Sequence, residues 1–329
     1  MIFSFASGLN DTAFGKHQAP IKQIIMNRGE YWKNKSMIDT LFDVQNADGW
    51  GEKATTRTGM RGWMPVGENG AHPIDETREG FSKVLEYMTW KDRFFISREA
   101  IDDASAYDLK TTPEDFTDGY YRSREDFAAA MYGAAAAGQK ELNYAGVKFN
   151  TITADGMPLF HNAHPAAVKG PKQSNLFSDA FSKEALGKLE TRMQNFVGDT
   201  GNTLDIAPDT ILISNYDYEL KNAVMEVVGS DKNPDNSNNG INYMYGRWNI
   251  IIWQGLNPYM RDGQWILLDS KYIKHYGANR WRNRVDMEIR SSIDNNTDAN
   301  VWDGYARFGA DFVDWRFAAI GGVSGGDAL

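Results

Sequence analysis

Residues 111–146 read TTPEDFTDGYYRSREDFAAAMYGAAAAGQKELNYAG, and they predict the longest element of the fold. Thr112 suits the N-cap of a helix, and Pro113 suits its first turn, where a missing backbone N–H breaks no hydrogen bond. Apolar and alanine side chains then recur at helical spacing and form one stripe for burial. We therefore predict a helix over about residues 113–145 that ends at Gly146 and is about 45 Å long at roughly 1.5 Å per residue.

The segments before this helix cannot form a core by themselves. In residues 1–40, short apolar pieces are interrupted by glycine and proline, which predicts an irregular N-terminal arm lying on other parts of the protein or on a neighbouring subunit. Residues 41–99 are rich first in glycine and threonine and then in β-branched and aromatic residues, which predicts a long two-strand hairpin with a glycine-rich outer part. Because an isolated hairpin is only marginally stable in water, this one needs a surface to lie on.

The second half of the chain alternates between helices and strands. Ser182 suits the N-cap of a helix with regularly spaced apolar residues, and TILISN at residues 210–215 has the pattern of a short strand. Residues 286–320 then return to strand patterns. Together with the long central helix, these patterns predict an α+β protein.

Composition excludes several classes of function. The chain has 329 residues, 42% of them hydrophobic, a net charge of −9 and no cysteine. The lack of cysteine removes disulfides, thiolate catalysis and iron–sulfur clusters, and it is compatible with a reducing cytosol. A protein whose task is to grip DNA phosphates is usually basic, so specific DNA binding is disfavoured. No apolar run approaches the roughly 20 residues of a membrane-spanning helix, so we expect no membrane role.

His161 and His164, with Asp155 just upstream, are the first candidates for a metal site. Zinc hydrolases usually present two histidines four residues apart on a helix with a glutamate between them, whereas this pair is three apart in a proline-containing stretch. We therefore expect these histidines to shape a loop. The sequence also lacks a P-loop, a dinucleotide fingerprint and a nucleophile elbow. We predict no enzymatic activity, no cofactor and no metal.

Arg280, Arg282 and Arg284 are the best candidates for contact with phosphate. They are interleaved with the acidic Asp286 and Glu288, so a salt-bridged strand edge explains them equally well. Both interpretations stay open at the level of sequence.

Two stretches resemble the Mu-like major head subunit family of tailed phages. ADGMPLFHNAHP at residues 154–165 leads through SNLFSDAFSKEAL at residues 174–186, as the family's D-G-x-P-L-F-x-x-x-H-P segment leads through Ser-Asn-Leu to a helix. IAPDTILISNYDYELKNAV at residues 206–224 resembles the family's strand and following helix, with Asn215 where a proline is common. The resemblance covers roughly residues 80–320. The matching positions of the first segment are Asp155, Gly156, Pro158, Leu159, Phe160, His164 and Pro165.

The resemblance implies the Hong Kong 97 fold of viral shell proteins. The implied parts are an N-terminal arm at 1–40, an extended β-hairpin loop and the start of the peripheral domain at 41–99, the peripheral domain with its spine helix (about 113–145) at 100–181, an axial α/β domain at 182–285, and a return to the peripheral sheet with a C-terminal tail at 286–329.

The implied function is that of a structural major capsid protein in a bacteriophage virion. Such a protein self-assembles in the host cytoplasm into hexamers and pentamers, which form the icosahedral viral head around double-stranded DNA. The implied partners are further copies of the chain, a portal protein, and scaffold or decoration proteins where a phage uses them. Packaged DNA would be contacted only non-specifically, at the inner face.

Subunit contacts are expected in the extended loop, at Trp50, Arg57, Arg61 and Trp63, because aromatic and arginine side chains anchor protein interfaces. Two alternatives stay open. One is an encapsulin-type compartment shell on the same fold. The other, from a different class, is a soluble carbohydrate-active or carbohydrate-binding protein that uses the many aromatic residues; monomeric behaviour and a deep pocket lined by acids and aromatics would favour it.

Overall fold

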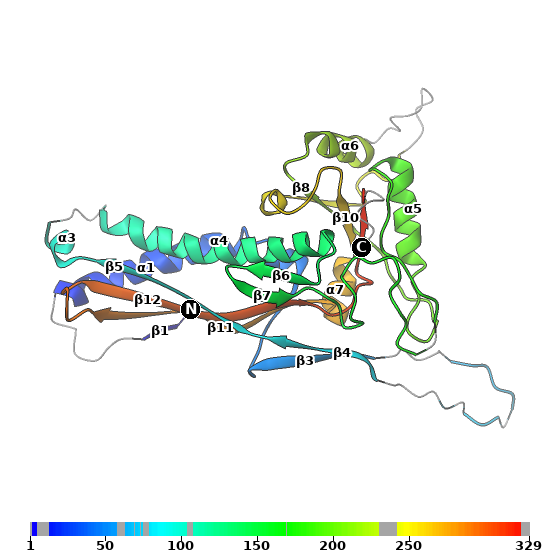
Figure 1. Ribbon diagram of the computed structural model, residues 1–329, viewed down its shortest axis with the longest axis horizontal. Coiled ribbons are helices and arrows are strands. Elements are labelled where there is room, and N and C mark those ends of the chain that lie inside the picture. The colour runs from blue at the N-terminus through cyan, green and yellow to red at the C-terminus, as the bar shows by residue number, and fades with distance from the viewer. Residues whose placement is uncertain are drawn as a thin grey trace.

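The computed structural model describes residues 2–4, 13–57, 63–68, 70–72, 74, 79–103, 108–168, 170–229 and 242–323. A long sheet with helices along it forms one part of the molecule, and a smaller sheet flanked by helices forms the other (Figure 1). A two-stranded hairpin projects from the long sheet.

The longest helix, α4, runs over Asp108–Ala136, so the expected bounds of 113–145 were wrong at both ends. It begins before Pro113, which lies inside its second turn. It ends where Gly138 adopts a left-handed φ of 63°. The backbone N–H groups of Gly138 and Gln139 then donate back to carbonyls of the last turn, which is a Schellman cap. A glycine earlier than the expected Gly146 therefore stops the helix.

The residues after this cap form a hairpin instead of a further helical turn. Its strands are β6 (Glu141–Tyr144) and β7 (Val147–Asn150). Ala145 and Gly146 make the connecting turn with positive φ values of 50° and 82°, the sign that a type I′ turn requires at both positions. Leu142, which lies within the range expected for the helix, belongs to this hairpin, and its side chain is buried there.

Close packing of α4 against the segment after the 3-10 helix η1 (Gln254–Leu256) leads to a first prediction. A Cβ added at Gly133 would lie 2.0 Å from the Cβ of Tyr259. Gly133→Ala is expected to lower the free energy of unfolding by about 1–3 kcal/mol, the usual cost of overpacking, although alanine is the better helix former. Gly119→Ala on the same helix is the control, because a Cβ there meets nothing within 4 Å. If chemical denaturation gives Gly133→Ala the same free energy of unfolding as the wild type, the close approach of α4 to Tyr259 is contradicted.

The long sheet is built around β11 (Asn279–Ile293) and β12 (Asn300–Phe312), an antiparallel pair that β5 (Met88–Ile96) extends on one side. On the other side, β11 pairs in parallel with β1 (Ile2–Ser4) and with β2 (Asp43–Asn46). The short helix α3 (Arg98–Asp103) follows β5, and α4 then runs back along the sheet (Figure 1). The core that α4 shares with this sheet contains the aromatic residues Trp90, Phe127, Trp281 and Phe308.

The sequence had suggested an irregular N-terminal arm, but residues 13–33 of this segment form the helix α1 (Ala13–Lys33), which has 21 residues and packs against α4. Ile25 is fully buried there. Arg28 pairs with Asp118 of α4, and the indole of Trp32 donates a hydrogen bond to the same carboxylate. Hydrogen bonding to Arg28 holds the pKa of Asp118 below its usual range. Tertiary contacts stabilise this helix, which explains why periodicity alone missed it.

The smaller sheet has the strand order β13-β10-β8-β9, with β8 parallel to β9 and antiparallel to β10. Its strands are β8 (Thr210–Ser214), β9 (Asn249–Trp253), β10 (Trp265–Leu268) and β13 (Ala318–Gly321). The strand expected at 210–215 is thereby confirmed. The helices of this part are α5 (Lys183–Gln194), α6 (Tyr218–Gly229) and α7 (Ser270–Tyr276). The cap expected at Ser182 is also present, since its hydroxyl accepts a hydrogen bond from the N–H of Ala185.

Two of the expected divisions do not follow the observed elements. The division between residues 285 and 286 falls inside β11, which runs unbroken from Asn279 to Ile293. The expected return of 286–329 to one sheet holds for β12 but not for β13, which pairs with β10 in the smaller sheet. The chain thus crosses between the two parts once more than the sequence pattern indicated.

The hairpin expected within residues 41–99 is formed by β3 (Gly51–Arg57) and β4 (Glu79–Glu86). It projects from the end of the long sheet, where β4 passes into β5 (Figure 1). Just before it, α2 (Ile38–Leu41) and β2 connect α1 to the long sheet.

Candidate functional site

Ion pairs join both strands of the hairpin to the long sheet. On β4, the ammonium group of Lys83 contacts the carboxylate of Asp311 on β12. On β3, the carboxylate of Glu52 accepts hydrogen bonds from Arg280 and Arg282, both on β11, and the Arg282 Nε to Glu52 Oε2 distance is 2.8 Å. The hairpin is therefore anchored at its root by partners that lie 228 or more residues away in sequence.

These contacts decide between the two interpretations of the arginine cluster. Arg282 is only 3% exposed and also pairs with Asp43, at 3.1 Å between Nη2 and Oδ2. Arg280 and Arg282 are thus structural salt-bridge partners, as the ionic interpretation expected. Their partners are Glu52 and Asp43, however, and not the interleaved Asp286 and Glu288, and β11 lies inside the long sheet and not at its edge. Within the described part of the chain, Arg284 forms no salt bridge.

Asp311 is the most perturbed carboxyl of this root. Its side chain is 3% exposed, and its Oδ2 has no hydrogen-bond partner among the described residues. Burial raises the pKa of Asp311 to about 6, against the opposing effect of the Lys83 charge. The root therefore holds a carboxyl that changes its protonation state in mildly acidic solution.

This raised pKa predicts a specific dependence of stability on pH. Between the usual aspartate pKa and about 6, the folded chain binds more protons than the unfolded chain, so the Asp311 contribution is present at low pH and is lost as pH rises. The loss is about 1.4 kcal/mol per pH unit, roughly 3 kcal/mol in total. Asp311→Asn removes this component, and denaturation of both proteins from pH 4 to pH 7 measures the difference. Parallel pH profiles would contradict the assignment.

The expected contact residues of the extended loop are placed unequally by the structure. Trp63 is fully exposed, and Trp50, which directly precedes β3, is 70% exposed. Arg57 is the last residue of β3, and Arg61 lies outside the described residues. The exposure of two large indoles is what an interface needs, and their role as subunit contacts stays a prediction.

The histidine pair lies in the loop region between β7 and α5. His164 is fully buried, stacks on Trp315 at 4.3 Å between ring centroids, and donates from Nδ1 to Asp155 at 2.7 Å. Burial would raise the pKa of Asp155, but hydrogen bonds from His164 and Thr153 outweigh it and hold that pKa below its usual range. Burial, and secondarily the neighbouring His164, lowers the pKa of His161. The pair orders a loop, as expected.

Asn175 completes this loop core. Its amide Nδ2 donates to the carbonyls of Leu159 and Ala318, and its Oδ1 accepts from the N–H of His161. Among the described residues, no group of three or more His, Asp or Glu side chains is arranged to hold a metal ion. In the same part of the chain, no helix has the length and apolar character to cross a bilayer.

Sequence reasoning missed Glu52, Lys83 and Asp311. Their strands carry many charges, and nothing in the local pattern distinguishes a buried partner from a solvated one. The only available signal is the position of Glu52 and Lys83 near the inner ends of the two hairpin strands, where a projecting hairpin must be attached.

Comparison with known proteins gives the class. Residues 88–321 match the family model described as phage capsid protein. Similar solved structures include a chain of Mycobacterium phage Patience, with 12% identity over 93% of this chain and 87% of that chain at a TM-score of 0.52. The capsid of the cyanophage P-SCSP1u has 10% sequence identity over 86% of each chain, at a TM-score of 0.52. A virus-like particle from Pyrococcus furiosus has 10% sequence identity over 92% of this chain and 97% of that chain, at a TM-score of 0.50. A search of curated proteins finds no match.

These three structural likenesses lie below 25% identity and show the fold, which is the Hong Kong 97-type capsid fold. The family match spans more than half of the sequence, and the chain belongs to the phage capsid protein family. It is a structural protein of the virion capsid and not an enzyme.

Proposed function

We propose that this capsid protein self-assembles into hexamers and pentamers that close an icosahedral head around double-stranded phage DNA. The observation that carries the proposal is the hairpin β3–β4, which is anchored by ion pairs at its root and presents the fully exposed Trp63 beyond its strands. A projecting hairpin with an exposed indole gains stability only by lying on another surface, and further copies of the chain supply one.

The parts of the fold take their roles accordingly. The hairpin is the extended loop, and α4 with the long sheet is the peripheral domain with its spine helix. The smaller sheet with α5 and α6 is the axial domain, and α1 is the N-terminal arm. In this assignment β13 belongs to the axial domain, because it pairs with β10.

The other partners follow from charge and family. A net charge of −9 suits a wall that contacts packaged DNA without binding it tightly. A portal protein, and scaffold or decoration proteins, are further proposed partners. The narrower resemblance to Mu-like head subunits stays a prediction. A compartment shell that loads enzyme cargo has the same fold, and the match to the phage capsid family favours the head.

Sedimentation tests the proposal. Purified chain is analysed on a density gradient with light scattering over a range of salt and protein concentrations. Large, discrete particles are expected, and particles isolated from phage-infected cells should contain DNA. A chain that stays monomeric under every condition, including with phage lysate added, would contradict the proposal. Particles filled with protein cargo in place of DNA would favour the compartment shell.

A further inference from the structure

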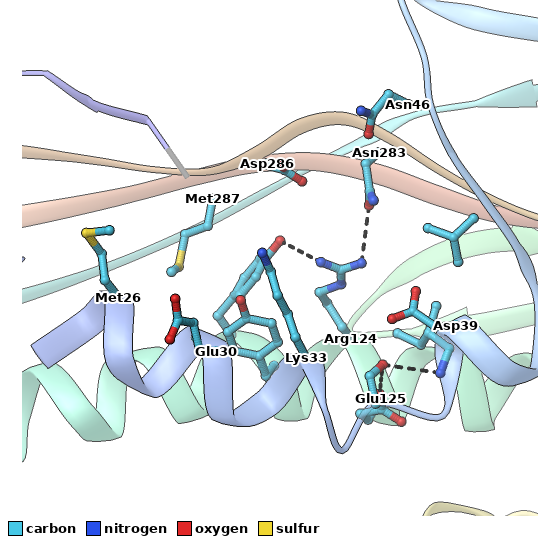
Figure 2. Close-up of a pocket in the computed structure, with 16 residues that line it drawn as sticks. Met26, Glu30, Lys33, Asp39, Asn46, Arg124, Glu125, Asn283, Asp286 and Met287 are labelled. Atoms are coloured by element: carbon cyan, nitrogen blue, oxygen red, sulfur yellow. Dashed lines mark hydrogen bonds between the residues drawn. The ribbon is translucent and has the colours of Figure 1, made fainter. Parts of the chain in front are cut away.

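Three consecutive residues of α4 reach three different segments of the chain. The guanidinium of Arg124 donates to Asn283 on β11, at 3.2 Å between Nη2 and Oδ1. The carboxylate of Glu125 accepts hydrogen bonds from the hydroxyl of Ser36 and the N–H of Met37, which follow α1. Figure 2 shows Arg124 hydrogen-bonded to Asn283, with Glu125 farther from that strand. This turn of α4 is therefore held both to the long sheet and to the segment after α1.

The third residue, Asp126, accepts hydrogen bonds from two tyrosines. The hydroxyl of Tyr144, on β6, donates to Oδ2 at 2.9 Å, and the hydroxyl of Tyr259 donates to Oδ1 at 3.1 Å. Tyr144 belongs to the hairpin that follows α4, and its ring packs on Phe127 of the same helix. Tyr259 belongs to the loop that leads from η1 to β10 of the smaller sheet. One carboxylate thus joins α4 both to its own part of the molecule and to the other part.

Both tyrosine hydroxyls remain donors at physiological pH. Burial, and secondarily the negative charge of Asp126, raises the pKa of Tyr259 to about 12. Burial also raises the pKa of Tyr144, with a further contribution from its hydrogen bond to Asp126. Because a protonated phenol donates a hydrogen bond and a phenolate does not, both bonds persist in neutral and mildly alkaline solution.

The surface of α4 near Asp126 lets the other part of the molecule come close. Ala129 and Gly133 lie on the same face of the helix as Asp126, since residues three, four and seven apart share a face. A Cβ on Gly255 of η1 would lie 3.2 Å from the Cβ of Ala129, and a Cβ on Gly133 would lie 2.0 Å from that of Tyr259. The side chain of Tyr259 thus begins on the backbone at Gly133 and ends at the carboxylate, two turns earlier in the helix.

The loop that carries Tyr259 is fixed to the smaller sheet on both sides. The hydroxyl of Ser214, at the end of β8, donates to Oδ1 of Asn257 at 2.9 Å. The N–H of Gly263 donates to Oδ2 of Asp217 at 2.7 Å. A rotation of the smaller sheet relative to α4 therefore moves Tyr259 with it and changes the contact with the carboxylate.

The chain itself passes between the two parts where α7 leads into β11 and where β12 leads into β13. Such crossings permit a hinge, and a further contact is needed to define one angle. We infer that Tyr259 and Asp126 form a latch that fixes the angle between the smaller sheet and α4, and that this angle sets the diameter of the assembled shell. The second half of the inference rests on the proposed self-assembly, because a change of angle within each subunit changes the curvature of the lattice that the subunits form.

Spin labels measure the angle in a chain that has no natural cysteine. Ser123→Cys places one label at an exposed position of α4, and Met225→Cys places the other at an exposed position of α6. Labelled chain is diluted with a large excess of unlabelled chain, so that distances within one chain are measured. Tyr259→Phe removes the hydroxyl and keeps the ring, and it is expected to broaden the distribution of label distances about twofold. Tyr144→Phe is the matched control: it removes the other hydrogen bond to the same carboxylate and should leave the distribution unchanged.

Particle diameters give the second readout. The share of particles with the wild-type diameter is expected to fall about threefold for Tyr259→Phe, with smaller shells and open sheets in their place. Tyr144→Phe should give the wild-type distribution of diameters. Thermal unfolding is measured alongside, and the two variants should melt at similar temperatures because each loses one hydrogen bond to the same group. A merely structural loss would lower melting temperature and particle yield without changing the diameter.

Three outcomes would overturn the latch: equal widths of the distance distribution for the wild type and Tyr259→Phe, equal broadening in Tyr259→Phe and Tyr144→Phe, or broadened distances with shells of unchanged diameter. If Tyr259→Phe does not fold, Asp126→Ala takes its place, and a narrow distance distribution for that variant would equally overturn the latch. A wild-type chain that never assembles would overturn the proposed self-assembly, whereas the label distances would still show whether the latch fixes the angle.

Discussion

Replacing residues 58–78 with the two residues Asn-Gly is expected to abolish closed shells while leaving the chain folded. Arg57 and Glu79 are paired across β3 and β4, so a two-residue turn can close the shortened hairpin directly. The root ion pairs of Glu52 and Lys83 lie outside the deleted segment and remain. The truncated chain therefore keeps its own core and loses the surface that is proposed to reach a neighbour.

Thermal unfolding and particle yield are measured together for this variant. We expect a melting temperature close to that of the full chain and a loss of shells by at least two orders of magnitude. The matched control is Trp63→Phe in the intact loop, which keeps an aromatic ring and should retain most of the particle yield. Intact shells from the truncated chain would contradict a role for the hairpin in assembly.

Lys83→Ala is expected to have the largest effect on folding. Removing one partner of a buried ion pair leaves the other charge uncompensated, and such changes cost about 3–5 kcal/mol. Lys83 is 9% and Asp311 3% exposed in this pair. The loss should be largest above pH 7 and clearly smaller at pH 5, because Asp311, with its pKa raised to about 6 by burial, is then protonated.

Lys148→Ala is the matched control, since Lys148 pairs with Glu141 at 2.8 Å on the surface, where both side chains are more than half exposed. Exposed pairs contribute about 0–1 kcal/mol, so this variant should unfold almost like the wild type. Urea denaturation at pH 5 and pH 8 measures all three proteins. If the two lysine variants lose equal stability at pH 8, the hairpin root is not a buried ionic contact.

The elements with strong local signals were predictable from sequence. Ser182 and the apolar period after it located α5, and the apolar run at 210–214 located β8. The stripe of apolar and alanine side chains ahead of Gly138 indicated the helix α4. The C-terminal end of this helix depends on which of several glycines adopts the left-handed conformation. Cap positions are set by one or two residues, which is why bounds err more than the existence of an element.

Contacts between distant segments were not predictable. The helix α1 depends on Asp118, some ninety residues later, and the hairpin root depends on Asp311, 228 residues after Lys83. Such pairs become visible only when the fold brings the strands together. Trp63 was expected from its residue type to be a subunit contact; its exposure fits that expectation, and the contact itself stays a prediction.

Electron microscopy of the purified chain tests the central claim most directly. If the chain self-assembles as proposed, closed shells built from rings of five and six copies are expected, or sheets and tubes of six-membered rings where closure fails. A compact single-chain particle under every salt and protein concentration would contradict it, and the exposed indole of Trp63 would then require a different partner.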